Sequence, residues 1–191
     1  MQYGFYFDQS RCSGCFTCII ACKDWHEWEL GSEPANWIKV IAVEKGRFPD
    51  LSVSQLFITC LHCAHPPCID ACPVGAITKR EEDGIVLTDR EVCLGNRGCE
   101  GFCQAACPYK APEFGPEPGA KIQKCDLCLD RWPEGKKPVC VEACPMRALD
   151  AGPLHELKMT YGDIRFVAGF AFSEEAEPSI VFKLKRGGAD L

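Results

Sequence analysis

The sequence lacks the long apolar run that a membrane-spanning helix needs. Such a helix takes about 20 consecutive, mostly apolar residues, whereas the stretch IRFVAGFAF at 164–172 is shorter and interrupted. The first residues, MQYGFYFDQSRC, also lack the basic segment followed by an apolar segment that is typical of a secretory signal. We therefore expect a chain that is soluble by itself and that reaches a membrane only through a partner.

Concentrated positive charge is missing as well. The chain has 21 Lys and Arg against 27 Asp and Glu, for a net charge of −6, and its basic residues occur only in small groups such as Lys136 and Lys137. Because nucleic-acid binding needs a concentrated basic surface, we expect no nucleic-acid partner. No nucleophile–base pair, phosphate-binding loop or open zinc site is visible either, so we expect no bond-making catalysis by this chain alone.

Cysteine, in contrast, is abundant: it accounts for 16 of the 191 residues. So many cysteines serve either as disulfides in a secreted scaffold or as thiolates on metal. They form four groups of four: group one is Cys12, Cys15, Cys18 and Cys22; group two is Cys60, Cys63, Cys68 and Cys72; group three is Cys93, Cys99, Cys103 and Cys107; group four is Cys125, Cys128, Cys140 and Cys144.

The spacing of three groups is typical of 4Fe–4S ligands. Group one is a C-x2-C-x2-C-x3-C run, in which three close thiolates bind one cluster. In two-cluster ferredoxins the fourth cysteine of such a run ligates the other cluster. Groups two and four keep the opening pair and end in C-x3-C-P, and only their middle gap is longer, at four and eleven residues. A loop can grow there because the entropic cost of loop closure rises slowly with length.

Zinc and disulfides are the alternatives. Tetrahedral zinc also favours CxxC pairs, and CLHCAHPPC (60–68) adds His62 and His65. However, zinc would need paired CxxC motifs, whereas every group ends in C-x3-C. We therefore favour clusters and expect the two histidines to lie beside a cluster or on the surface. A Rieske site would need a later C-x2-H, which the sequence does not contain.

Group three, CLGNRGCEGFCQAAC (93–107), departs from this pattern because its first gaps are five and three residues. It is either a stretched cluster motif or a broken one. We favour a stretched loop, since breaking the group would leave thiols without a role. The glycines within it suit backbone that wraps a cluster with positive φ angles.

Internal repetition predicts how the groups pair. GFYFDQSRC (4–12) before group one resembles GIVLTDREVC (84–93) before group three, and each has an aspartate, Asp8 or Asp89, four positions ahead of its cysteine. CPVGAIT (72–78) after group two resembles CPMRALD (144–150) after group four. We expect both aspartates to accept backbone hydrogen bonds where the strand meets the loop.

Groups two and three then form one ferredoxin-like module, with strands at LFIT, AIT, IVLTD and PYKAPEF and a hairpin turn at Asp83–Gly84. Groups one and four form the other. The predicted fold class is α+β: two interleaved two-cluster modules, rich in loops, with short strands and helical turns. The predicted domains are 1–55 with 115–163, an inserted module at 56–114, and a C-terminal arm at 164–191 that gains order from a partner.

Exchange of the fourth cysteines within each module completes four ligand sets. They are Cys12, Cys15, Cys18 and Cys144 (site 1); Cys22, Cys125, Cys128 and Cys140 (site 2); Cys60, Cys63, Cys68 and Cys107 (site 3); and Cys72, Cys93, Cys99 and Cys103 (site 4). Each set is expected to bind one 4Fe–4S cluster, and no cysteine is left over.

QYGFYFDQSRCSGCFTCIIACKDW (2–25), CLHCAHPPCIDACPVGAITKREEDGIVLTD (60–89) and the segment 124–163 closely resemble the electron-transfer B subunits of the dimethyl sulfoxide reductase family. The resemblance covers about residues 2–163 and, more loosely, PSIVFKLK near the end. It implies an electron relay attached to a molybdenum or tungsten bis-pterin catalytic subunit. In that family group one lies nearest the catalytic subunit, and group three lies nearest a membrane anchor or another redox partner.

Because group three departs from the family pattern, we expect a different or modified redox partner at that end. The resemblance also implies a peripheral subunit, either cytoplasmic or exported with a partner that carries a twin-arginine signal. Two alternative functions stay open at this point. One is the same relay in a formate-, hydrogen- or sulfur-compound-linked complex, and the other is a zinc-stabilised assembly module.

Overall fold

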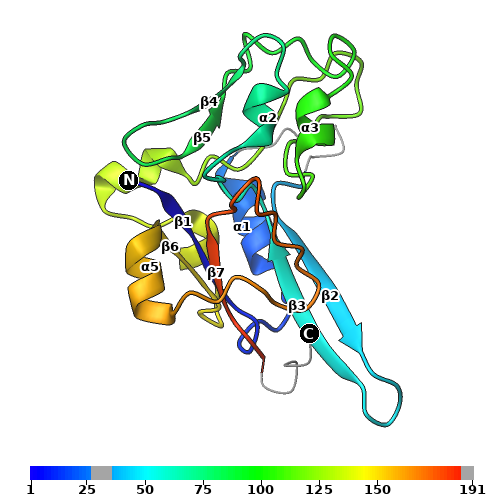
Figure 1. Cartoon of the computed structure of the whole chain (residues 1–191), viewed down its shortest axis with the longest axis vertical. Coiled ribbons are helices and arrows are strands. Elements are labelled where there is room, and N and C mark those ends of the chain that lie inside the picture. Colours follow the sequence, from blue (N-terminus) through cyan, green and yellow to red (C-terminus); the bar gives the residue numbers. More distant parts are fainter. Residues whose placement is uncertain (27–35, 186–191) are drawn as a thin grey trace.

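The structure is a computed structural model that describes residues 1–26 and 36–185. Figure 1 shows two neighbouring regions and a projecting ribbon. The elements are β1 (Tyr3–Asp8), α1 (Thr17–Trp25), β2 (Lys39–Lys45), β3 (Ser52–Ile58), α2 (Pro67–Asp70), β4 (Ile77–Lys79), β5 (Val86–Thr88), α3 (Phe102–Ala106), the 3-10 helix η1 (Leu129–Glu134), α4 (Val139–Glu142), β6 (Leu149–Pro153), α5 (Leu154–Tyr161) and β7 (Ile180–Lys183). This α+β, loop-rich composition was predicted.

A three-stranded sheet with the order β6-β1-β7 forms the lower region (Figure 1). β1 pairs antiparallel with β6 and parallel with β7. Phe5 and Phe7 of β1 face the main core, whereas Tyr6 faces a smaller cluster under α5. This close strand packing requires glycine at position 4, because a Cβ there would lie 2.2 Å from the carbonyl oxygen of Ser179.

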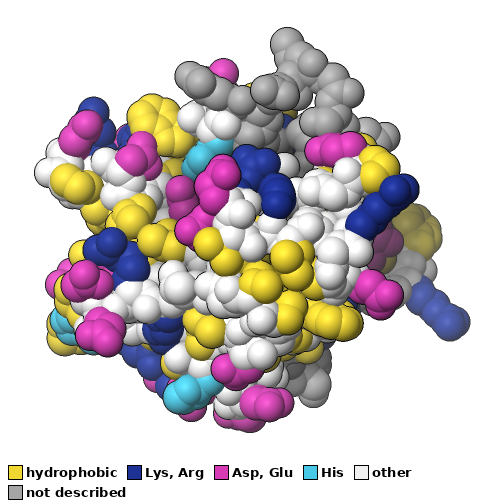
Figure 2. All heavy atoms as spheres, turned by 90° about the horizontal axis from the view of Figure 1, so that it is seen from above, with side chains coloured by type: hydrophobic (Ala, Val, Ile, Leu, Met, Phe, Trp, Pro, Cys, Tyr) yellow, Lys and Arg dark blue, Asp and Glu magenta, His cyan; other side chains and the backbone are white. Residues whose placement is uncertain are grey.

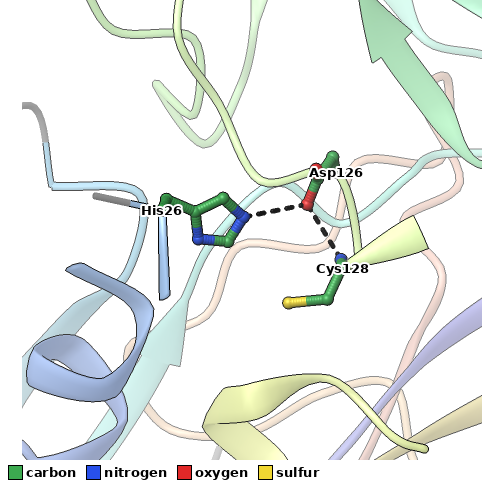
Figure 3. A group of neighbouring side chains, drawn as sticks. All are labelled: His26, Asp126 and Cys128. Carbon is green, nitrogen blue, oxygen red and sulfur yellow. Dashed lines mark hydrogen bonds and ion pairs between the residues drawn. The ribbon is translucent and has the colours of Figure 1, made fainter. Parts of the chain in front are cut away.

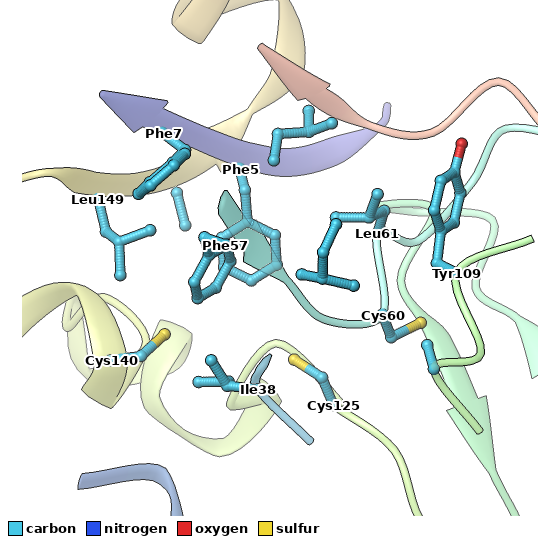
Figure 4. Packing of buried hydrophobic residues seen from close by; sticks show 14 of the residues in the cluster. Phe5, Phe7, Ile38, Phe57, Cys60, Leu61, Tyr109, Cys125, Cys140 and Leu149 are labelled. Atoms are coloured by element: carbon cyan, nitrogen blue, oxygen red, sulfur yellow. The ribbon is translucent and has the colours of Figure 1, made fainter. Parts of the chain in front are cut away.

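The β2–β3 ribbon projects from this core (Figure 1). Its base is anchored by Phe57, whose ring centroid lies 5.6 Å from that of Phe5 and 5.9 Å from that of Phe7. Figure 4 shows these three rings together, with Cys140, Cys125 and Cys60 on the segments that border them. The main aromatic core therefore lies directly beside the cysteine loops.

A second, smaller pair of strands, β4 and β5, repeats the arrangement of β6 and β1. The N–H of Asp89 after β5 donates to the carbonyl of Ala76 before β4, and the N–H of Asp8 donates to the carbonyl of Ala148 before β6; both distances are 2.8 Å. The repeat seen in the sequence thus corresponds to two equivalent strand pairs.

Each aspartate also shapes the loop that follows its strand, as predicted. Asp8 Oδ1 accepts the N–H of Ser10 at 2.8 Å, and Asp89 Oδ1 accepts the N–H of Glu91 at 2.9 Å. The carbonyls of the same two aspartates accept the N–H groups of Cys12 and Cys93. These turns fix where the first cysteine of groups one and three begins its loop.

Replacing Asp8 with asparagine should destabilise the protein. The residue is 1% exposed, and burial alone would raise its pKa, but hydrogen bonds from Ser10 and Lys183 lower the pKa from its usual 3.8. Loss of charge-assisted hydrogen bonds should cost about 1.5–3 kcal/mol. The stability that a depressed pKa provides is lost as pH falls, so the difference from wild type should be constant between about pH 8 and 5 and shrink below about pH 4.

The measurement is anaerobic urea unfolding of wild type and Asp8→Asn at pH 7, where the full difference is expected, and at about pH 3, where it should be smaller. Asp50→Asn, on an exposed residue of the ribbon, serves as the matched control. Equal unfolding midpoints for Asp8→Asn and Asp50→Asn would contradict this role of Asp8.

Two predicted segments differ in the structure. PYKAPEF (108–114) contributes only an isolated bridge between Glu113 and Gln123, because Pro108 and Pro112 lack backbone donors. The first three residues of LFIT lie in β3 and pair with β2 instead of with a strand of the inserted module.

The C-terminal arm is the other difference, since it is ordered within the chain as far as residue 185. Ile180, Val181 and Phe182 of β7 are at most 2% exposed and extend the central sheet beside β1. Residues 186–191, the end of the predicted arm, and residues 27–35 lie outside the described part of the chain.

Among the helices described, none has the length and apolar character to cross a membrane. Figure 2 views the molecule from the end that carries α2 and α3. Hydrophobic side chains are exposed on this face between acidic and basic groups.

Four cysteine-lined sites

Short helices carry the third cysteine of every group. Cys18, Cys68, Cys103 and Cys140 lie in α1, α2, α3 and α4, and the fourth cysteine of each group follows four residues later. Because each of these helices lies between two ligand sets, its third and fourth cysteines contribute to different sites.

Three of the predicted ligand sets each line one cavity. The cavities contain Cys12, Cys15, Cys18 and Cys144 at site 1; Cys60, Cys63, Cys68 and Cys107 at site 3; and Cys72, Cys93, Cys99 and Cys103 at site 4. The four cysteines of site 2 are also neighbours, since Cys125 interacts electrostatically with Cys22 and Cys128, and Cys140 does the same. The structure thus brings together every set that the sequence predicted.

The sites follow one another in the order 1, 2, 3, 4. Burial is the main cause that raises the pKa of Cys22 and of Cys68 to about 12, and the pKa of Cys125 well above 9. Each also has a smaller contribution from a cysteine of an adjoining site: Cys18 acts on Cys22, Cys60 on Cys125, and Cys103 on Cys68. These three links join sites 1 and 2, sites 2 and 3, and sites 3 and 4.

The two end sites reach the surface, whereas the two middle sites do not. All eight cysteines of sites 2 and 3 are buried. At site 1 Cys15 is exposed, and at site 4 Cys72 and Cys99 are partly exposed. Exposed apolar side chains surround both ends: Phe16, Ile20 and Met146 near site 1, and Val74, Leu94 and Phe102 near site 4.

All four groups begin with the same turn. The residue two positions after the first cysteine has a positive φ angle: 71° at Gly14, 43° at His62, 80° at Gly95 and 60° at Leu127. Group three therefore starts like the others. At Gly95 the close approach of Gly119, whose oxygen would lie 2.4 Å from an added Cβ, also requires glycine.

Group three diverges at Asn96, which stands three positions after Cys93, where the other groups have their second cysteine. The Asn96 side chain donates to the carbonyls of Gly115 and Glu117 at 3.3 and 3.1 Å and accepts the N–H of Gly119 at 2.8 Å. It ties the longer loop to the segment 115–119 instead of reaching the site.

Cys99 then takes the place of the missing cysteine in the cavity of site 4. This arrangement favours a stretched loop over a broken one. Its sequence signal is the CLGN start of group three, with asparagine at the expected cysteine position.

Backbone N–H groups point at several of the thiols. The N–H groups of Ala76 and Ala148 donate to Cys72 and Cys144 Sγ at 3.3 and 3.4 Å. Such bonds stabilise a thiolate and its bound cluster. Without metal, burial favours the neutral thiol and is the main reason that the pKa of Cys18 rises to about 12.

Neither of the two histidines near group two lines the cavities of sites 1, 3 and 4. His62 is fully buried, and its Nδ1 accepts the N–H of Val86 at 3.0 Å. Burial is the main cause that lowers its pKa well below 6.5, so the ring is neutral. His65 is exposed. Both positions agree with the roles expected from the sequence.

Family profiles and relatives that match this chain describe iron–sulfur proteins and oxidoreductase subunits. A family profile described as 4Fe-4S dicluster domain matches residues 53–154, and a second profile with the same description matches residues 11–76. The B subunit of anaerobic dimethyl sulfoxide reductase from Escherichia coli is 42% identical over 190 residues, covering 95% of this chain and 88% of the relative. The Haemophilus influenzae protein of the same name is 39% identical over 191 residues, covering 95% and 89%.

The chain belongs to the family of dimethyl sulfoxide reductase B subunits. Another relative, the B subunit of sulfite dehydrogenase from Allochromatium vinosum, is 35% identical over 173 residues, covering 81% of this chain and 70% of the relative. The two profile matches together include all sixteen cysteines, so this family member holds four 4Fe–4S clusters. Neither match follows the predicted module boundaries, which stay a prediction.

One group near site 2 in this family member was not singled out from the sequence. His26 Nε2 lies 3.4 Å from Asp126 Oδ1, which also accepts the N–H of Cys128 at 2.8 Å (Figure 3). His26 Nδ1 contacts the carbonyl of Cys22, four residues earlier, at 2.9 Å. The three side chains could hold a metal ion by distance, but Cys128 belongs to site 2. Asp126 instead fixes the turn of group four against the end of α1.

Replacing Asn96 with alanine should loosen the site 4 loop that distinguishes this family member. The loss of three hydrogen bonds should cost about 1–3 kcal/mol of local stability. A chelator reaches the cluster when the loop opens, and a cost of about 1–3 kcal/mol raises the population of the open loop about 5–150-fold. We therefore expect the site 4 cluster to be lost faster by about that factor.

Electron paramagnetic resonance (EPR) spectra recorded during the exposure would follow each cluster separately. Asn36→Ala, on an exposed residue, is the control. Uniform loss of all four signals in Asn96→Ala, or the same rate as in Asn36→Ala, would contradict a specific role for Asn96.

Proposed function

We propose that this chain relays electrons through four 4Fe–4S clusters, held by sites 1, 2, 3 and 4 in that order, between a catalytic subunit and a second redox partner. One observation carries the proposal: two buried sites lie between two sites that reach the surface. Electrons then enter and leave at the exposed ends, and the buried middle sites are kept from solvent. Family membership supports the same role in an oxidoreductase complex.

The sixteen cysteines are the proposed ligands, with the membership of each site as defined above. Each bound cluster supplies one-electron oxidation and reduction. The chain's own residues fix its place: thiolates bind the iron, short helices separate the third and fourth ligands of a group, and backbone N–H groups donate to sulfur. We further propose that groups one and four belong to one module, 1–55 with 115–163, and groups two and three to another, 56–114.

The proposed catalytic partner is a molybdenum or tungsten bis-pterin subunit, because the chain belongs to the family of dimethyl sulfoxide reductase B subunits. We place it at site 1, where Phe16, Ile20 and Met146 are exposed. The proposed partner at site 4 is a membrane anchor or another redox protein. The longer loop around Asn96 supports a modified partner surface there. The complex would be cytoplasmic or exported with a catalytic partner that carries a twin-arginine signal.

The test is anaerobic purification of the chain or its complex, followed by iron and acid-labile sulfide analysis and an EPR redox titration. For the isolated chain we expect a brown protein with about sixteen iron and four one-electron spin systems. About twelve iron would mean that one site binds no cluster. A colourless protein that contains zinc would overturn the proposed function.

A further inference from the structure

Lys124 is a buried cation between two of the proposed cluster sites. It immediately precedes Cys125 of site 2, and it lines the cavity of site 3 together with Cys60 and Cys68. The residue is only 2% exposed. Figure 4 shows Cys60 and Cys125 on neighbouring segments at this junction.

Hydrogen bonds hold the ammonium in place but do not neutralise it. Lys124 Nζ donates to the carbonyl of Val86 and, at 2.9 Å, to the carbonyl of Cys125. Both acceptors are uncharged. Within residues 1–26 and 36–185, Nζ has no carboxylate at ion-pair distance. The nearby Asp126 carboxylate interacts with Lys124 only at longer range, and its Oδ1 already binds His26 and the N–H of Cys128.

A buried ammonium without an anion is costly, because desolvation of an ion takes several kcal/mol even after relaxation. A 4Fe–4S cluster with four thiolates is anionic and becomes more negative when it is reduced. Lys124 lines the cavity of site 3 beside Cys60 and Cys68, so its charge lies next to the place where a cluster would bind. A cluster in this cavity would supply the missing negative charge.

We propose that Lys124 is a positioning residue whose fixed positive charge raises the reduction potentials of the clusters at sites 2 and 3. The inference rests on the proposed function, because it assumes clusters at both sites. A cation near a cluster favours the more negative, reduced state. Lys124 thereby sets the electron-transfer step that joins the two middle sites.

A merely structural role makes a different prediction. In such a role, its two hydrogen bonds would hold β5 against the loop of group four, and its charge would have no effect on the clusters. Lys124→Gln keeps a donor without the charge, Lys124→Met removes both, and Lys124→Arg keeps the charge. If the charge matters, the glutamine and methionine variants should lower the reduction potentials of the middle clusters equally, and the arginine variant should keep them near wild type. If only bracing matters, Gln behaves like wild type.

The experiment is an EPR redox titration of anaerobically purified complexes, with iron measured in each. Lys136→Met is the matched control, because Lys136 is an exposed lysine paired with Glu134. At the wild-type midpoint we expect the ratio of reduced to oxidised cluster to fall about tenfold for one or both middle sites in Lys124→Gln and Lys124→Met. For a one-electron couple this equals a shift of about 59 mV. Lys124→Arg and Lys136→Met should stay near wild type.

Full iron content with unchanged midpoints in Lys124→Gln and Lys124→Met would overturn the inference and leave the proposed function intact. If Lys124→Gln has wild-type potentials and Lys124→Met does not, the role of Lys124 is structural, and this result would also overturn the inference. Loss of a cluster in Lys124→Arg would also overturn the inference, since arginine keeps the positive charge at position 124. Failure of the proposed function would appear separately, as missing cluster signals in the wild-type protein.

Discussion

Replacing Cys22 with alanine should remove the cluster of site 2 and leave that of site 1, although Cys22 belongs to the same sequence run as Cys12. The reason is geometric. Cys22 is buried on α1, one turn after Cys18, and interacts with Cys128, Cys125 and Cys140 of site 2. The cavity of site 1 is completed instead by Cys144 of group four, more than 120 residues later in the sequence. Iron should fall from about sixteen to about twelve, or to about fifteen if a three-iron cluster survives.

Paired variants identify which cluster is lost. Cys22→Ala and Cys125→Ala should lack the same EPR signal, whereas Cys144→Ala and Cys12→Ala should both lack a different one. Turnover that depends on the partner at site 4 should drop to background in Cys22→Ala, because site 2 lies inside the relay. Turnover with a dye that reacts at the catalytic subunit should persist. If Cys22→Ala instead matched Cys12→Ala, the exchange of fourth cysteines would be wrong.

The cysteine sites could be anticipated from the sequence because local geometry dictates them. The predicted cluster ligands are cysteines at short, repeated spacings, and the two equivalent strand-and-loop repeats indicate which groups belong together. Even the unusual group three followed this logic, since its turn at Gly95 matches those at Gly14, His62 and Leu127. Asp8 and Asp89 were predictable for the same reason: each makes its hydrogen bonds within a few residues of itself.

What the sequence did not reveal depends on contacts between distant segments. β7 joins the central sheet only because β1 offers it a free edge, and nothing local distinguishes SIVFK from an exposed arm. The pairing of β3 with β2 likewise crosses a predicted module boundary at 55–56. Lys124 looks like an ordinary surface lysine in the sequence. Its burial follows from the meeting of β5, group two and group four, which no periodicity encodes.

Removing the clusters should unfold the region around sites 3 and 4 before the central sheet. This region has little structure of its own: β4 and β5 have three residues each, and α2 and α3 have four and five. Helices this short are not stable alone. Three of the seven buried residues in its core cluster are cysteines, namely Cys68, Cys93 and Cys103.

The expected loss is large compared with the stability of a domain. A structural metal site can contribute about 10 kcal/mol or more to folding, and a whole domain is typically stable by about 5–15 kcal/mol. Hydrogen exchange measured after chelation under reducing conditions should therefore show complete loss of protection at Ala76 and Ile122, whose N–H groups donate to cluster cysteines. Phe5 and Phe182, in the aromatic core of the β6-β1-β7 sheet, should keep partial protection.

Adding iron and sulfide back should restore protection at all four positions, which separates cluster loss from irreversible damage. Protection retained at Ala76 and Ile122 in the iron-free chain would mean that the loops are stable without clusters. Earlier loss at Phe5 than at Ala76 would reverse the expected order. In either case, the region around sites 3 and 4 would not need its clusters in order to fold. The short strands and buried thiols around sites 3 and 4 argue for the opposite, a fold that the clusters themselves complete.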